Sequence, residues 1–201
     1  MDPWVVVEHC QPLQEIQIPL PEVKDSEVLI QVTLSGACHT DLRFWEGHYD
    51  LGGGQKMTVA NRGIMLLRAM GHEILGTVAK LGPDVQGLKL GDPRIVFPWL
   101  RCGDCRVRET GYEKLCDCLQ SVGIFRDGGM ASFIDIRHPR YLGDPGDLAL
   151  AVACIYSCSG TTALNDIRKL SPFIPTESVV ATYFALQAAN VCRINTITRS
   201  I

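Results

Sequence analysis

The chain has 201 residues, of which 46% are apolar and 20% charged, and its formal net charge is −3. This composition provides a packed core for one large domain or two small ones. No apolar run approaches the ~20 residues that span a bilayer, and the broad positive charge of nucleic-acid-binding proteins is missing, so we expect neither a membrane nor a nucleic-acid partner.

Nine cysteines are many for a chain whose start, Met1-Asp2-Pro3-Trp4, lacks the basic region of a signal peptide. We therefore expect a cytoplasmic protein. In a reducing compartment, clustered cysteines indicate metal binding or catalysis more than disulfides. The count is also odd, so complete pairing is impossible.

The first clear strand pattern lies at residues 27–34, where Val28, Ile30, Val32 and Leu34 alternate with other residues. A period of two predicts a strand with these four side chains on one buried face. The spacing after it predicts a helix over residues 40–45, with Leu42 and Trp45 available to one apolar wall.

The segment Gly52-Gly53-Gly54-Gln55-Lys56 resembles a phosphate-binding loop only superficially. Its lysine is not followed by Ser or Thr and no strand precedes the glycines, so we interpret it as a flexible surface loop. Further strands are expected at 5–7, 73–80, 94–97 and 130–136. Many short strands separated by turns predict a β-barrel.

Beyond Gly160 the period changes, and the sequence predicts a helix at 161–170 that Pro172 ends. A short strand at 178–181 and a helix at 182–193 are expected to follow. All nineteen glycines lie at or before Gly160. The fold class is therefore mainly β with some α, followed by a short α/β segment.

Two glycine-flanked turns offer side chains that bind metals. The first, residues 36–42, carries the thiol of Cys38, and the second, Gly71-His72-Glu73, carries an imidazole and a carboxylate. Cys158 is a third candidate, much later in the chain. Two cysteines and one histidine suit a catalytic zinc ion that keeps one coordination position open.

Five motifs occur in one order along residues 4–180: Cys38-His39-Thr40-Asp41, Gly71-His72-Glu73, Gly91-Asp92, the cluster from Cys102-Gly103-Asp104-Cys105 to Leu115-Cys116, and Cys158-Ser159-Gly160. Together they resemble the zinc-dependent alcohol dehydrogenases of the medium-chain dehydrogenase/reductase family. The resemblance implies a GroES-like β-barrel catalytic domain at residues 1–172 and a truncated remnant of a Rossmann domain at 173–201. It also implies interconversion of a small alcohol and aldehyde with NAD or NADP.

The same resemblance implies a role for each residue at the zinc site. In this family the zinc ion stabilises an alkoxide as a Lewis acid, so that hydride can leave the carbon atom. The implied zinc ligands are Cys38, His72 and Cys158. Thr40 is expected to hydrogen-bond the alcohol and take its proton, Asp41 to fix the site from outside the ligand shell, and Glu73 to approach the metal during substrate exchange.

The sequence departs from the family in its proton route and in its second metal cluster. Arg43 stands where members commonly carry a histidine, and a guanidinium cannot act as a base; His48 is close to it in sequence. In the pattern C-X₂-C-X₂-C-X₇-C of the structural zinc, Cys102, Cys105 and Cys116 fill three positions and Arg108 the other. Because the set is incomplete, we expect three thiols without a tightly held metal, unless Cys118 substitutes.

The third departure concerns the dinucleotide. The glycines of a Rossmann loop let the backbone approach the pyrophosphate at a helix N-terminus. Here Val179-Val180-Ala181 continues into Thr182-Tyr183-Phe184-Ala185 without a glycine. NAD or NADP is thus expected from the family only, with the binding site absent from this chain.

We therefore expect an alcohol-dehydrogenase-like oxidoreductase subunit that is inactive alone. One alternative is a non-catalytic zinc-binding or interaction protein, derived from a dehydrogenase, that docks on a full-length relative. Another is a truncated or misread gene product. Trp45 and Trp99 either line a pocket for a bulky alcohol or belong to the core, so the substrate is left open.

Overall fold

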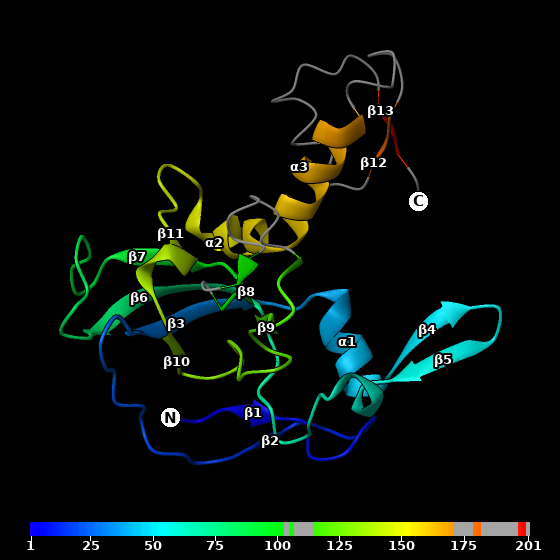
Figure 1. Ribbon diagram of the computed structural model, residues 1–201, viewed down its shortest axis with the longest axis horizontal. Helices are drawn as coiled ribbons and strands as arrows, with labels where there is room; N and C mark the ends of the chain where they lie inside the picture. The colour runs from blue at the N-terminus through cyan, green and yellow to red at the C-terminus, as the bar shows by residue number, and fades with distance from the viewer. Residues whose placement is uncertain (103–104, 107–114, 171–178, 182–196, 200–201) are drawn as a thin grey trace. The chain divides into compact units, whose positions relative to one another are not determined.

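The computed structural model describes residues 1–102, 105–106, 115–170, 179–181 and 197–199 (Figure 1). The chain divides into two compact units, Met1–Cys154 and Ile155–Ile201. Up to its last helix, the first unit contains β1 (Trp4–Val5), β2 (Gln14–Glu15), β3 (Val28–Gly36), α1 (His39–Glu46), β4 (His48–Gly52), β5 (Gln55–Thr58), the 3₁₀ turn η1 (Ala60–Arg62), β6 (Glu73–Leu81), β7 (Pro93–Val96), β8 (Trp99–Leu100), β9 (Gln120–Ser121), β10 (Phe133–Ile136), η4 (Pro139–Tyr141), β11 (Leu142–Gly143) and α2 (Leu150–Ala153).

A five-stranded sheet forms the centre of the first unit, in the order β10-β3-β6-β7-β11 (Figure 1). Every neighbouring pair in it is antiparallel. Its largest apolar cluster consists of Val28, Ile30, Ile74, Val78, Val96, Leu100, Val122, Ile134, Ile136 and Tyr141. Each fully buried aliphatic side chain stabilises the fold by about 1.5–3 kcal/mol. The strands expected at 73–80 and 94–97 are confirmed as β6 and β7.

The alternation predicted for residues 27–34 is wrong at its end. Val28 and Ile30 are fully buried as expected, but Leu29 is buried too and Leu34 is 37% exposed. The pairing of β3 with β6 shifts register between Val32 and Leu34. An extra residue at such a bulge reverses the side-chain alternation, which turns Leu34 outward.

The helix expected at 40–45 is confirmed as α1, but its buried face was predicted incorrectly. Phe44 is fully buried, whereas Leu42 is 55% exposed. Residues three apart share a helix face, and Asp41 is drawn inward with Phe44, so Leu42 lies on the other side. Trp45 packs against a second apolar cluster, and its Nε1 donates to the Gln11 carbonyl oxygen at 2.6 Å. That cluster consists of Val6, Phe44, Val59, Ile64 and Met70.

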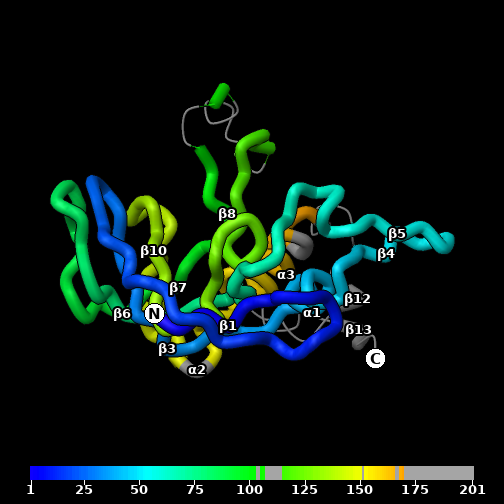
Figure 2. The backbone as a smooth tube through the Cα atoms, turned by 90° about the horizontal axis from the view of Figure 1, so that it is seen from below, coloured from blue at the N-terminus to red at the C-terminus, as the bar shows by residue number. Residues whose placement is uncertain are grey.

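The glycine-rich segment at 52–56 is the tip of a hairpin formed by β4 and β5 (Figures 1 and 2). Its residues are exposed, as expected for a surface segment, although it is not an irregular loop. Gly52, Gly53 and Gly54 all have positive φ. Glycine adopts this backbone conformation without strain, which allows the tight reversal between the strands.

The second unit begins within the 3₁₀ turn η5 (Cys154–Ser157) and continues with α3 (Ser159–Leu170), β12 (Val179–Ala181) and β13 (Ile197–Arg199). α3 confirms the helix expected at 161–170, and β12 confirms the strand expected at 178–181. β12 and β13 pair in parallel, as is typical of α/β folds. The helix expected at 182–193 lies outside the described residues. Among those described, no helix is long and apolar enough to cross a membrane.

Candidate metal centre

Cys38 lies at the junction of β3 and α1, where it is the N-cap of the helix. Its backbone N–H donates to Asp41 Oδ2 at 2.8 Å, and the Asp41 N–H donates to the Cys38 carbonyl oxygen at 3.0 Å. The Cys38 sulfur also accepts from the Asp41 backbone, so the two residues form a reciprocal capping box. The start of α1 therefore fixes the turn that carries the thiol.

His72 directly precedes β6, and the same aspartate holds its turn. Asp41 Oδ1 accepts from the Gly71 N–H at 3.0 Å and lies 3.3 Å from His72 Nδ1. Asp41 is only 3% exposed. A carboxylate on Nδ1 orients the imidazole and leaves Nε2 for a metal ion, an arrangement common around metal-binding histidines. One buried carboxylate thus connects the two turns that carry Cys38 and His72.

A glycine pair fixes the His72 turn from its other side. Gly128 N–H donates to the Ala69 carbonyl oxygen at 2.8 Å, and Gly129 N–H donates to that of Gly71 at 2.7 Å. A Cβ atom on Gly128 would lie 2.2 Å from the Gly71 oxygen, so a side chain there would force the segments apart. This contact was not predicted, although the two adjacent glycines after Asp127 were a signal for it.

The charges around His72 favour a cation at this site. Burial lowers the pKa of the His72 imidazole, but hydrogen bonds and charge interactions with Asp41 and Cys38 outweigh it and raise the pKa from 6.5 to about 10. A protonated imidazole or a divalent cation would supply the positive charge. Zinc takes thiolate and neutral imidazole ligands, so these residues fit a zinc ion that displaces the proton.

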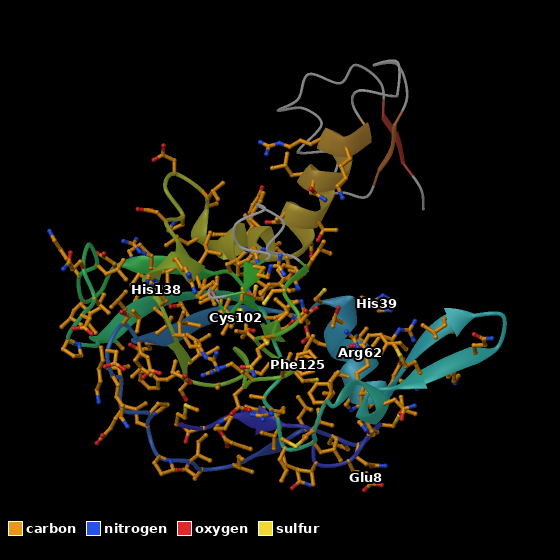
Figure 3. All side chains as sticks on the ribbon, viewed as in Figure 1. Glu8, His39, Arg62, Cys102, Phe125 and His138 are labelled. Atoms are coloured by element: carbon orange, nitrogen blue, oxygen red, sulfur yellow. The ribbon has the colours of Figure 1, made fainter. Side chains whose placement is uncertain are left out.

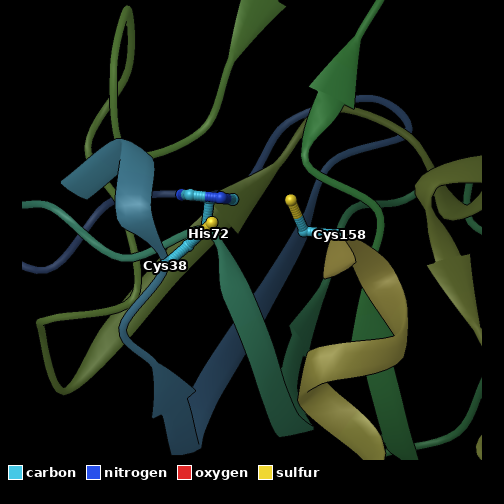
Figure 4. A group of neighbouring side chains, drawn as sticks. All are labelled: Cys38, His72 and Cys158. Carbon is cyan, nitrogen blue, oxygen red and sulfur yellow. The ribbon is translucent and has the colours of Figure 1, made fainter. Parts of the chain in front are cut away.

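Cys38 Sγ and a ring nitrogen of His72 lie within 4.8 Å of one another (Figure 4). Cys158 is the third ligand that the sequence predicts. It belongs to the second unit, is buried, and directly precedes α3. His39, the neighbour of Cys38, is exposed and points away from the core of the first unit (Figure 3), so His72 is the imidazole at this site.

Thr40 and Glu73 flank these ligands in sequence. Thr40 is half-buried in the first turn of α1, and Glu73 is fully buried at the start of β6. A Cβ atom on Gly36 would lie 2.6 Å from Glu73 Oε2, so glycine at 36 makes room for this carboxylate.

The two residues considered for the proton route make contacts elsewhere on α1. Arg43 forms an ion pair with Glu46, with its Nη1 2.7 Å from Glu46 Oε2. His48 Nδ1 lies 3.2 Å from the carbonyl oxygen of Glu46. Neither contact involves Cys38, His72 or Thr40.

The second cysteine cluster also comes together. The sulfur atoms of Cys102, Cys105 and Cys116 lie within 4.8 Å of one another, and those of Cys102 and Cys116 are 3.4 Å apart. Cys118 is exposed and is not part of this group. Arg108 lies outside the described residues.

The Asp41→Asn substitution is expected to lower the unfolding free energy of the metal-free chain by about 1.5–3 kcal/mol, because an amide offers one acceptor oxygen in place of a charged pair. Because the pKa of His72 is raised, the stability that its interaction with Asp41 gives the folded state is fully present below pH 6.5. This stability is lost as the pH rises through about 10. The difference from the unsubstituted chain should therefore be larger at low pH. Urea unfolding with chelator across this range measures it. The exposed Asp84→Asn is the control, and a pH-independent difference would refute the Asp41–His72 coupling.

Comparison with known proteins shows the family of the chain. The family model of the alcohol dehydrogenase GroES-like domain matches residues 24–142. An NAD-dependent alcohol dehydrogenase of Sulfurisphaera tokodaii is 35% identical over 166 residues, which cover 83% of this chain and 47% of that protein. The chain thus spans about half the length of the curated relatives it matches.

Solved structures show the same fold. The crystal structure of an NAD-dependent alcohol dehydrogenase superposes with a TM-score of 0.82 at 23% identity, covering 99% of this chain and 57% of the other. A thermostable alcohol dehydrogenase of Pyrobaculum aerophilum with bound cobalt and zinc gives 0.78 at 22% identity, covering 99% and 59%. These matches confirm the predicted resemblance, and the chain therefore belongs to the alcohol dehydrogenase family whose catalytic domain is GroES-like.

Proposed function

We propose that this chain supplies the zinc-holding, alcohol-binding part of an NAD- or NADP-dependent alcohol dehydrogenase. Cys38, His72 and Cys158 are the proposed zinc ligands. The observation that carries this proposal is the buried carboxylate of Asp41, which holds the turns of the first two ligands with its two oxygen atoms. In this assignment, residues 1–172 form the catalytic domain and 173–201 belong to a nucleotide-binding domain.

A bound zinc ion would act as a Lewis acid towards the alcohol oxygen. The hydroxyl of Thr40 both donates and accepts hydrogen bonds, so it can hold the substrate hydroxyl and take its proton. Asp41 keeps His72 Nδ1 engaged, which leaves the other ring nitrogen for coordination. Glu73 provides a second buried carboxylate next to His72, and we assign it to substrate exchange.

The proton cannot leave through position 43 by acid–base exchange. A guanidinium cannot act as a base, and that of Arg43 is already paired with Glu46. The proposed route from Thr40 to solvent therefore does not use this side chain.

A second candidate function is a non-catalytic zinc-binding or interaction protein that associates with a full-length relative. The sequence feature that favours it is the absence of any glycine after Gly160, which removes the usual dinucleotide loop after Val179–Ala181. Both candidate functions share the zinc site and differ in whether the chain takes part in alcohol oxidation.

Elemental analysis of the dialysed protein tests the shared part. We expect about one zinc ion per chain, because one set of three ligands with an open position is complete and the four-thiolate set is not. Cys38→Ser should lose this ion, whereas the exposed Cys10→Ser should keep it. Zero zinc in the unsubstituted chain would refute the ligand assignment, and two would show that the second cluster is closed by another group.

A further inference from the structure

Cys102, Cys105 and Cys116 bring three sulfur atoms together within the first unit. A structural zinc site in this family is closed by four thiolates, and here the fourth position in sequence is Arg108. Cys118, the nearest substitute, is exposed and lies outside the group. The donor set therefore does not fit a closed tetrahedral zinc site.

We propose that Cys102 and Cys116 form a reversible disulfide by exchange with low-molecular-weight disulfides. Their sulfur atoms are 3.4 Å apart and in hydrogen-bonding contact. A disulfide bond is about 2.04 Å long, so the two sulfur atoms, already in contact, must approach each other further for the bond to form. This inference concerns a cluster separate from Cys38 and His72 and does not depend on the proposed zinc site.

The different exposure of Cys102 and Cys116 determines the order of the two thiol–disulfide exchange steps. Cys102 is half-buried, whereas Cys116 is only 6% exposed, so an incoming reagent reaches Cys102 first. The Cys102 thiolate attacks one sulfur of the small disulfide, which forms a mixed disulfide and releases one small thiol. The Cys116 thiolate then attacks the Cys102 sulfur and releases the second. The two protein thiols lose two electrons and two protons, and the small disulfide is reduced to two thiols.

Cys105 is the natural internal comparison, because it belongs to the same cluster and is also half-buried. We pair Cys102 with Cys116, whose sulfur atoms are 3.4 Å apart, and Cys105→Ser tests whether the third thiol of the cluster is needed. Cys118, two residues from Cys116 but exposed, is the comparison for simple proximity in sequence.

The test is to incubate the full chain with oxidised glutathione and a metal chelator, block remaining thiols, and map the cysteines by peptide mass spectrometry. The expected product is a linked pair of peptides containing Cys102 and Cys116, lost on treatment with dithiothreitol. The Cys116→Ser variant should stop at glutathione attached to Cys102, and Cys102→Ser should form neither product. Cys105→Ser and Cys118→Ser should still form the linked pair.

Circular dichroism of each variant, with Cys116→Ala as a second substitution, shows whether the fold is retained. A dominant bond from Cys105 or Cys118, or glutathione trapped on Cys105 in the Cys116 variants, would overturn the assignment. So would an unsubstituted chain whose Cys102 and Cys116 stay reduced in the folded state at every ratio of oxidised to reduced glutathione.

Discussion

The Arg108→Cys variant is expected to melt at a clearly higher temperature in zinc than in chelator, a difference that the unsubstituted chain should not show. Three of the four thiolates of the sequence pattern already lie within 4.8 Å of one another. A cysteine at position 108 completes the pattern, and a metal that binds only the folded state adds its binding free energy to stability. Structural zinc contributes about 10–16 kcal/mol in small zinc-binding domains, so even a fraction of this gain is measurable by calorimetry.

Arg106→Cys is the matched control, because it removes an exposed arginine from the same region and places the thiol outside the pattern. It should give no zinc-dependent gain. If Arg108→Cys behaves like this control, the loop is not built to close around a metal ion, and the match to the four-cysteine pattern is without structural meaning.

The second large effect concerns turnover. The 201-residue chain, tested alone, is expected to show no saturable binding of NAD or NADP and no alcohol oxidation with either. Hydride transfer requires the nicotinamide and the alcohol carbon to be held together, and such positioning contributes on the order of 7–11 kcal/mol to lowering the barrier. No glycine follows Gly160 to let the backbone approach a pyrophosphate.

Calorimetry at high cofactor concentration, with a spectrophotometric assay over primary, secondary and aromatic alcohols, measures both quantities. Turnover that is present in the unsubstituted chain and lost in Cys38→Ser would contradict this expectation. It would mean that a dinucleotide reaches the zinc site without a glycine-rich loop. Saturable binding without turnover would likewise contradict the expected absence of a dinucleotide site.

The strands and the helix whose residues follow a simple periodic pattern were predicted from the sequence. β6 and β7 follow from alternation bounded by turns, and α3 from helical spacing that ends before Pro172. The outward turn of Leu34 could not be predicted, because a bulge is a property of how β3 pairs with β6. Phe44, not Leu42, is buried because Asp41 fixes the rotation of α1.

The candidate site, too, could be predicted from the sequence only in part. Its ligands follow from a motif series, whereas the contacts that hold them join residues far apart in sequence. Asp41 reaches Gly71 and His72, thirty and thirty-one positions away. Gly128 packs on the Gly71 oxygen from still further along the chain. The spacing of the cysteines predicted that Cys102 and Cys116 belong to one cluster. The 3.4 Å contact between their sulfur atoms could be found only from the structure.

X-ray absorption at the zinc edge is the decisive measurement for the proposal that Cys38, His72 and Cys158 hold one zinc ion. The Cys102→Ser/Cys116→Ser double variant removes the second cluster from the signal. We expect two sulfur atoms at about 2.3 Å and one imidazole nitrogen at about 2.0–2.1 Å, with one light atom in the open position. Cys158→Ser should reduce the sulfur count by one. A shell without sulfur, or a shell unchanged by Cys158→Ser, would contradict the assignment.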